Sequence, residues 1–253
     1  MSAACSEGPV TLLPREVRLV VERILLLTAL PAGSIPAVRD VVLYAAAAGL
    51  GGLPLLRQRF EDLRAADPAA LRITEAAPGV LAADAGGQHT WTVLPMILDA
   101  LGEAAAREGS AMASVTNLLD PEELRAACAL GPRHGLSVFA AEGACTGPAT
   151  GREAALRRTD APGTTLLAIP APDARDAVLD RALRQGVTVE PELWWALHHL
   201  SNTALSTDTP ESRRHAGPVI VQPDGRIIGR SDHDDDTDIS LLISTKPESA
   251  DAH

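Results

Sequence analysis

The sequence predicts an α/β protein with a helical N-terminal layer, a small mostly parallel central sheet, and a C-terminal helix followed by a β-hairpin. Three observations lead to this fold class. Apolar residues recur at helical spacing through the first seventy residues, strand-like and helix-like segments then alternate, and two β-branched runs flank a Pro-Asp-Gly turn near the C-terminus. Strands and helices that alternate about thirty residues apart are typical of βαβ units, and a parallel sheet is therefore expected.

Three helices are expected in the N-terminal layer. Pro14 suits the first position of a helix, and the apolar residues that follow it lie on nearly all sides, so this helix should be buried. A second helix is expected from about Ser34 to Gly49, and a third from Pro54 to about Ala66.

The alternating middle contributes the expected sheet. Its strands are predicted at 80–83, 111–116, 136–141 and 164–169. A helix is expected over 93–108, and another begins at Asp120, where Glu123 completes the pattern of a capping box, and ends near Gly135. Cys128, in that second helix, is expected in the core. The segment EGACTGPATGRE should be a loop.

Two further helices, 174–185 and 191–205, and the hairpin VIVQPDGRIIGR complete the chain, with one more strand expected at 239–244. Residues 1–13 are expected to be a flexible N-terminus and 246–253 a disordered tail. Between them we expect a single α/β domain, 14–245, made of a helical subdomain (14–70) and an α/β core with the C-terminal hairpin (71–245).

Composition narrows the function. The 253 residues carry a formal net charge of −11, and this argues against a nucleic-acid partner, because phosphate binding needs a concentrated basic face. No apolar run approaches the roughly 20 residues that a membrane span needs, and the start MSAACSEGPV lacks the features of a signal peptide. Three scattered cysteines form no disulfide framework. We expect a cytoplasmic bacterial protein; whether it forms a homo-oligomer stays open.

One candidate site is the turn DAGGQH, because ligands of parallel sheets bind at the carboxyl ends of the strands. The backbone N–H groups of Gly86, Gly87 and Gln88 lie before a helix, where they could hold an anion. His89 is the candidate catalytic acid or base. The structural alternative is a plain glycine turn with a histidine that serves only the fold.

A second candidate is SRRH, where Ser212, Arg213 and Arg214 could converge on a carboxylate or phosphate. The alternative is that one arginine ties this turn to an acidic neighbour. SDHDDDTD lacks the glycine and the distal glutamate of an EF-hand, so no metal site is predicted, and whether the aspartate-rich segment 232–238 binds a cation stays open. A nucleophilic Cys145 would need a neighbouring base. The sequence identifies no cofactor.

The order of several segments resembles the bacterial family known as domain of unknown function 3726. The segments are "GLGGLPLL", "LPMILDAL", "VTNLLDPEELRAAC", "VTVEPELWWALHHLSNTAL" and "TPESRRHAG", and they span most of residues 15–218. The resemblance implies no established activity. The chain departs from that family's C-terminal pattern where it continues with PVIVQPDGRIIGR.

A weaker resemblance is to the malate/lactate dehydrogenase family that is unrelated to Rossmann enzymes. It depends on the helical start, "DAGGQ" and "GREAALRRTDAPGTTLLAIPAP". The resemblance implies a catalytic histidine in a Ser-His-Gly motif after the early helices, but this chain has Leu50, Gly51 and Gly52 there.

We therefore predict a small-molecule metabolic enzyme whose substrate carries a carboxylate or phosphate. The site would lie among DAGGQH, AEGACTGPATG and SRRH. Two alternatives stay open: a non-catalytic scaffold or partner-binding protein of a metabolic pathway, and an NAD(P)-dependent oxidoreductase-like protein.

Overall fold

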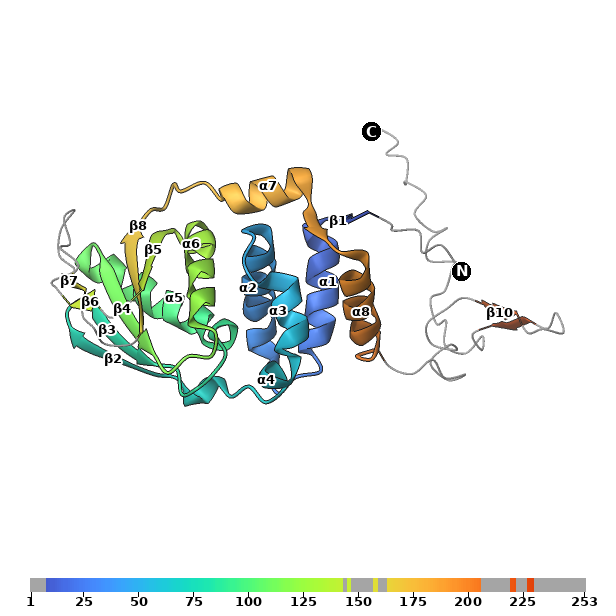
Figure 1. Ribbon diagram of the computed structural model, residues 1–253, viewed down its shortest axis with the longest axis horizontal. Coiled ribbons are helices and arrows are strands. Elements are labelled where there is room, and N and C mark those ends of the chain that lie inside the picture. The colour runs from blue at the N-terminus through green and yellow to red at the C-terminus, as the bar shows by residue number, and fades with distance from the viewer. Residues whose placement is uncertain are drawn as a thin grey trace, which may run out of the picture. The chain divides into compact units, whose positions relative to one another are not determined.

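The computed structural model describes residues 8–142, 145–146, 157–158, 163–205, 219–221 and 227–229. The chain divides into two compact units, Met1–Leu205 and Ser206–His253. The first unit holds the helical layer and the sheet, and Figure 1 shows the helices α1 to α4 on one side of α5 and α6 with the sheet beyond them. The single-domain assignment 14–245 stays a prediction.

The N-terminal layer is helical, as predicted. Its helices are α1 (Pro14–Leu25), α2 (Ile35–Ala47), α3 (Gly52–Gln58) and α4 (Phe60–Arg64). The expected third helix is split at Arg59, whose φ of −101° and ψ of 16° lie outside helical geometry. The Arg59 side chain donates to Asp120, which lies outside the helical layer.

A mixed five-stranded sheet stands at the centre of the first unit, and the α/β class is confirmed. The strands are β2 (Arg72–Ala77), β3 (Val80–Asp84), β4 (Ala111–Thr116), β5 (Leu136–Glu142) and β8 (Thr164–Pro170), in the order β2-β3-β4-β8-β5. The expectation of a mostly parallel sheet is wrong. Within this sheet only β3 and β4 pair in parallel, because β8 inserts antiparallel between β4 and β5.

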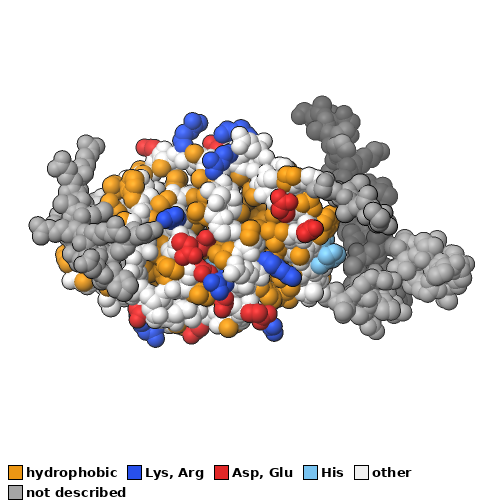
Figure 2. Space-filling model, in the orientation of Figure 1, with side chains coloured by type: hydrophobic (Ala, Val, Ile, Leu, Met, Phe, Trp, Pro, Cys, Tyr) orange, Lys and Arg blue, Asp and Glu red, His pale blue; other side chains and the backbone are white. Residues whose placement is uncertain are grey.

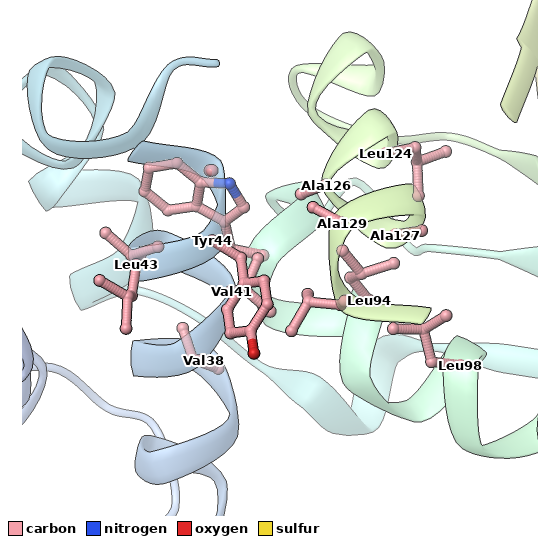
Figure 3. Close-up of a cluster of buried hydrophobic side chains, with 14 of the residues drawn as sticks. Val38, Val41, Leu43, Tyr44, Leu94, Leu98, Leu124, Ala126, Ala127 and Ala129 are labelled. Atoms are coloured by element: carbon pink, nitrogen blue, oxygen red, sulfur yellow. The ribbon is translucent and has the colours of Figure 1, made fainter. Parts of the chain in front are cut away.

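The core lies between the sheet and the helical layer. Helix α5 (Thr90–Glu108) is the central element, and apolar side chains of β4 and β8 face it. In Figure 3, Tyr44 and Val41 of α2 face Leu94 and Leu98 of α5. The N-terminal helices and the sheet therefore share one continuous core, to which Trp91 and Tyr44 contribute the largest buried side chains.

Several elements were not predicted. Strand β2 has only one partly buried side chain, Ile73, so its sequence gives little apolar alternation. Strand β1 (Val10–Leu12) pairs antiparallel with β9 (Val187–Val189). The flexible N-terminus expected over 1–13 therefore does not hold for these three residues. Strands β6 (Cys145–Thr146) and β7 (Arg157–Arg158) pair within and just after the expected loop.

The segment after Asp120 is less regular than expected. It consists of two 3₁₀ turns, η3 (Pro121–Arg125) and η4 (Gly131–His134), around a short helix α6 (Ala126–Leu130). Cys128 is exposed on α6, so the expectation of a core position is wrong. The helices α7 (Ala177–Gln185) and α8 (Pro191–Asn202) follow as predicted. None of the described helices has the length and apolar character needed to cross a membrane.

The second unit contains the predicted hairpin. Strand β10 (Val219–Val221) pairs antiparallel with β11 (Ile227–Gly229), with Ile220 opposite Ile228. The β-branched runs on either side of Pro-Asp-Gly therefore form the two strands. The strand expected at 239–244 and the tail 246–253 lie outside the described residues.

Candidate functional site

The glycine turn before α5 is built from two residues with positive φ, 62° at Gly86 and 75° at Gly87, a conformation that favours glycine. Its N–H groups all donate within the protein: Gly86 to Asp84 Oδ1 (2.9 Å), Gly87 to the Asn117 carbonyl (2.8 Å) and Gln88 to the Ala85 carbonyl (3.1 Å). The Gln88 side chain accepts from the Asp67 N–H at 2.7 Å. An anion here would have to displace these bonds.

His89 is the N-cap of α5. Its Nδ1 accepts the Trp91 backbone N–H at 3.2 Å, so the ring proton lies on Nε2. Nε2 is 3.3 Å from Asp120 Oδ2, but without the geometry of a hydrogen bond. The residue is 3% exposed, and burial lowers its pKa to about 4, although the Asp120 carboxylate acts in the opposite direction. At neutral pH the ring is uncharged.

Asp120 binds an arginine of the helical layer. Arg59 donates to it twice, from Nε to Oδ2 at 2.7 Å and from Nη2 to Oδ1 at 2.8 Å. The Asp120 backbone is left-handed, with φ 54°, and its side chain does not cap the turn that follows. The predicted capping box of Asp120 and Glu123 is therefore wrong, because both carboxylates are engaged elsewhere.

Glu123 is 4% exposed and bridges the two layers. Its Oε1 accepts the Gly51 N–H at 3.0 Å and its Oε2 accepts Trp91 Nε1–H at 3.0 Å. Burial raises the pKa of this carboxyl, while the two hydrogen bonds act to lower it. A Cβ atom on Gly51 would lie 2.6 Å from Oε1, so Glu123 leaves no room for a side chain there.

We call Arg59, His89, Trp91, Asp120 and Glu123, together with Gly51, the buried corner. Its side chains join α3 to the start of α5 and to η3. To reach a substrate, His89 would have to break its capping hydrogen bond with the Trp91 N–H, and its ring would have to leave its buried position. The geometry gives this histidine a structural task, and its catalytic role stays a prediction.

The structure does not describe the predicted site residues of the SRRH turn. Ser212, Arg213 and Arg214 lie outside the described residues, as does the aspartate-rich stretch 232–238. The same holds for the side chain of Cys145, whose backbone is in β6. Among the described residues no three His, Cys, Asp or Glu side chains are grouped to hold a metal ion.

A cavity of about 500 Å³, which we call the strand-end cavity, lies beside the buried corner; the predicted site segment AEGACTGPATG reaches it at Ala141, while its other described lining residues were not predicted. It is lined by Pro121, Glu122, Arg125, Ala140, Ala141, Gly163 and Thr164. It lies where β5 ends and β8 begins, next to η3. Glu122, Arg125 and Thr164 give it an acid, a cation and a hydroxyl. Only the pairing of β5 with β8 brings these segments together, so no local pattern marks the site.

Solved structures show where this fold occurs. The chain is similar to a dehydrogenase from Sinorhizobium meliloti, with a TM-score of 0.51 and 14% identity over 77% of this chain and 100% of that one. For a malate dehydrogenase from Pyrococcus horikoshii OT3 the TM-score is 0.53 and the identity 8%, over 80% of this chain and 98% of that one. For a putative malate/lactate dehydrogenase from E. coli the TM-score is 0.50 and the identity 9%, over 80% of this chain and 97% of that one. At such identities the likeness shows the fold alone.

No family model matches the chain, and no curated protein matches it. The resemblance to domain of unknown function 3726 therefore stays a prediction. The likeness in fold agrees with the other resemblance, to the malate/lactate dehydrogenases. At the position where that resemblance implies a catalytic histidine, Gly51 has no side chain and Glu123 fills the space that one would need.

Proposed function

We propose that this protein is a small-molecule metabolic enzyme that binds a carboxylate- or phosphate-bearing substrate in the strand-end cavity. The observation that carries the proposal is the cavity itself, about 500 Å³ at the ends of β5 and β8. This volume falls within the roughly 300–1,000 Å³ typical of small-molecule sites.

The lining supports an anionic substrate. The Arg125 guanidinium offers a planar set of donors suited to a carboxylate or a phosphate. Thr164, 9% exposed, adds a hydroxyl, and Glu122 is a candidate proton acceptor on the same wall. The buried corner, whose Asp120 directly precedes Pro121, holds this wall in place through the two hydrogen bonds from Arg59 to Asp120.

A second candidate is a non-catalytic, partner-binding protein on the same fold. It is favoured by Gly51, which replaces the histidine that the dehydrogenase resemblance implies, and by the internal bonding of the glycine turn. The same observations weigh against an NAD(P)-dependent oxidoreductase, which the fold likeness alone supports.

The test is a thermal-shift and calorimetric screen of the full chain against short carboxylates, sugar phosphates, NADH and NADPH. A ligand of the native state raises Tm in a concentration-dependent way. We expect a carboxylate or phosphate compound to bind, and Arg125→Ala to weaken it while Arg184→Ala, on the exposed end of α7, does not. Equal binding by both variants would reject the cavity as the site.

Turnover separates the two candidates. A ligand found in the screen is incubated with the protein and its chemical change is followed by NMR, with and without NADH. Conversion that depends on Glu122 supports the enzyme, whereas binding without conversion favours the non-catalytic protein. Oxidation of NADH by 2-oxo acids would instead support the oxidoreductase.

A further inference from the structure

We propose that a second site, the cleft between α2, α5 and η4, binds a small oxyanion such as phosphate. This arginine cleft has a volume of about 220 Å³ and lies apart from the strand-end cavity, with which it shares no lining residue. Its polar groups come from Arg39 and Asp40 of α2, Asp99 of α5, and Arg133 and His134 of η4. The proposal is independent of the proposed function.

Three guanidinium groups converge on one buried carboxylate that lines this cleft; Arg39 and Arg133 also line it, whereas Arg18 does not. Asp40 is 5% exposed. Its Oδ1 is 3.2 Å from Arg18 Nε and 3.0 Å from Arg39 Nη2, and its Oδ2 is 2.9 Å from Arg133 Nη2. One carboxylate thus faces three positive charges, so the cluster holds more positive charge than its own buried acid neutralises.

The neighbouring acids reduce this excess only in part. Glu22 accepts from Arg39 Nη1 at 2.6 Å, but its side chain is 44% exposed. Asp99 is 3.6 Å from His134 Nδ1 and 74% exposed. Water screens Asp99 strongly at this exposure, whereas Glu22 is no more exposed than Arg133. Three guanidinium groups against Asp40 and Glu22 therefore leave one positive charge in excess. An additional anion in the cleft would complete the balance.

Arg133 lines the cleft and has more N–H donors than its described partners use. A guanidinium has five N–H groups in a planar fork. Arg133 is 44% exposed, and besides Asp40 it lies near the hydroxyl of Tyr44, which itself donates to Asp176. Arg133 therefore keeps donors free on its exposed side, where an oxyanion with several acceptor oxygens can bind two of them at once.

The walls of the cleft set the size and strength of the site. Pro36, Leu98 and Leu130 line it with apolar surface, so the polar contacts that a ligand can make here come from its charged side chains. The volume of the cleft is about 220 Å³. That is room for phosphate or a short phosphate ester, but it is below the roughly 300–1,000 Å³ of sites for larger ligands.

The test uses the full chain in phosphate-free buffer and inorganic phosphate as the probe, with sodium chloride at matched ionic strength as the reference. We expect a saturable rise in Tm with phosphate and broadening of its ³¹P signal. A Tm that follows ionic strength alone, with no saturation, would overturn the proposal.

Variants locate the binding. Arg133→Gln should weaken phosphate binding about tenfold or more, because a bidentate charged donor is lost, and Arg133→Lys by less. Arg184→Ala should leave it unchanged. Since Arg133 is at the surface, its variants should fold, and circular dichroism checks this. Unchanged affinity in Arg133→Gln, or lost affinity in Arg184→Ala, would contradict the assignment.

A last arm compares free phosphate with small phosphate esters. Tighter binding of an ester than of phosphate identifies a metabolite's phosphate group as the ligand, and the reverse identifies the free ion. If neither binds, the arginine cluster only joins α2 to η4 and the proposal fails.

Discussion

Two charged clusters join the helical layer to the rest of the first unit, and they are built differently. In the buried corner, Arg59 meets Asp120 and every oxygen of Glu123 has a protein donor. In the arginine cleft, three guanidinium groups share Asp40. The corner is closed, with Gly51 required because no side chain fits, whereas the cleft opens to solvent through Arg133.

This difference shows that burial of charged groups serves two purposes here. A cluster whose donors and acceptors are mostly matched within the protein, as in the corner, where His89 Nε2 is the unmatched donor, fixes the relative position of elements and leaves little for a ligand. A cluster with surplus donors at the rim of a cleft can accept a ligand in addition to holding the fold. The three predictions that follow test this contrast.

The largest effect is expected for Glu123→Ala in the corner. It leaves the buried Trp91 Nε1–H and the Gly51 N–H without acceptors, which should lower the free energy of unfolding by about 3 kcal/mol. Glu123→Gln keeps one side-chain oxygen and should cost only about 1 kcal/mol. Urea denaturation measures both. Equal losses in the two variants would show that the two hydrogen bonds are not what holds the corner.

A smaller effect is expected for Asp40→Asn in the cleft. Removal of the charge leaves three guanidinium groups without their shared carboxylate, but their partial exposure limits the cost to about 2 kcal/mol. The effect of phosphate on Tm separates the two clusters more clearly than the loss of stability does. Phosphate should raise the Tm of Asp40→Asn more than that of the wild type, whereas phosphate should not rescue Glu123→Ala. If phosphate raised the Tm of wild type, Asp40→Asn and Glu123→Ala equally, the proposed difference between the buried corner and the arginine cleft would be wrong.

The smallest effect at neutral pH is expected for His89→Ala, which removes the cap of α5 and should lower the free energy of unfolding by about 1 kcal/mol. His89→Asn keeps an acceptor for the cap, so its free energy of unfolding should fall by less. The pH dependence is more diagnostic. Because the pKa of His89 is lowered to about 4 in the folded state, the unfolded chain binds more protons between pH 4 and 6.5. The stability from this residue is therefore full above pH 6.5 and falls toward pH 4.

The His89→Asn variant isolates that contribution. Glu123, whose pKa is raised in the folded state, acts in the opposite direction as the pH falls, and other carboxyl groups also titrate in this window. The difference between wild type and His89→Asn removes these common terms. A difference that stays constant from pH 7 to pH 4 would show that His89 is not buried as a neutral ring.

The sequence indicated most local elements correctly. Apolar periodicity located α1, α2, α5 and the strands β3 to β5, and Pro-Asp-Gly located the hairpin. It failed at β2, whose side chains are mostly exposed, and at the 3₁₀ turns after Asp120, whose acidic residues look like a helix cap. In both cases contacts made with distant residues outweigh the local pattern.

The candidate site shows the same division more strongly. The sequence alone singled out the glycine turn and His89, and it located the start of α5 to within a few residues, because turns and helix starts depend on neighbouring residues. Only the tertiary structure decided that β8 lies antiparallel between β4 and β5, which creates the strand-end cavity. Likewise, only the tertiary structure brought Arg18 and Arg133 to Asp40. These partners are 22 and 93 residues away from Asp40 in the sequence (40 − 18 and 133 − 40). Their pairing depends on how whole helices and turns pack, and no local sequence pattern predicts it.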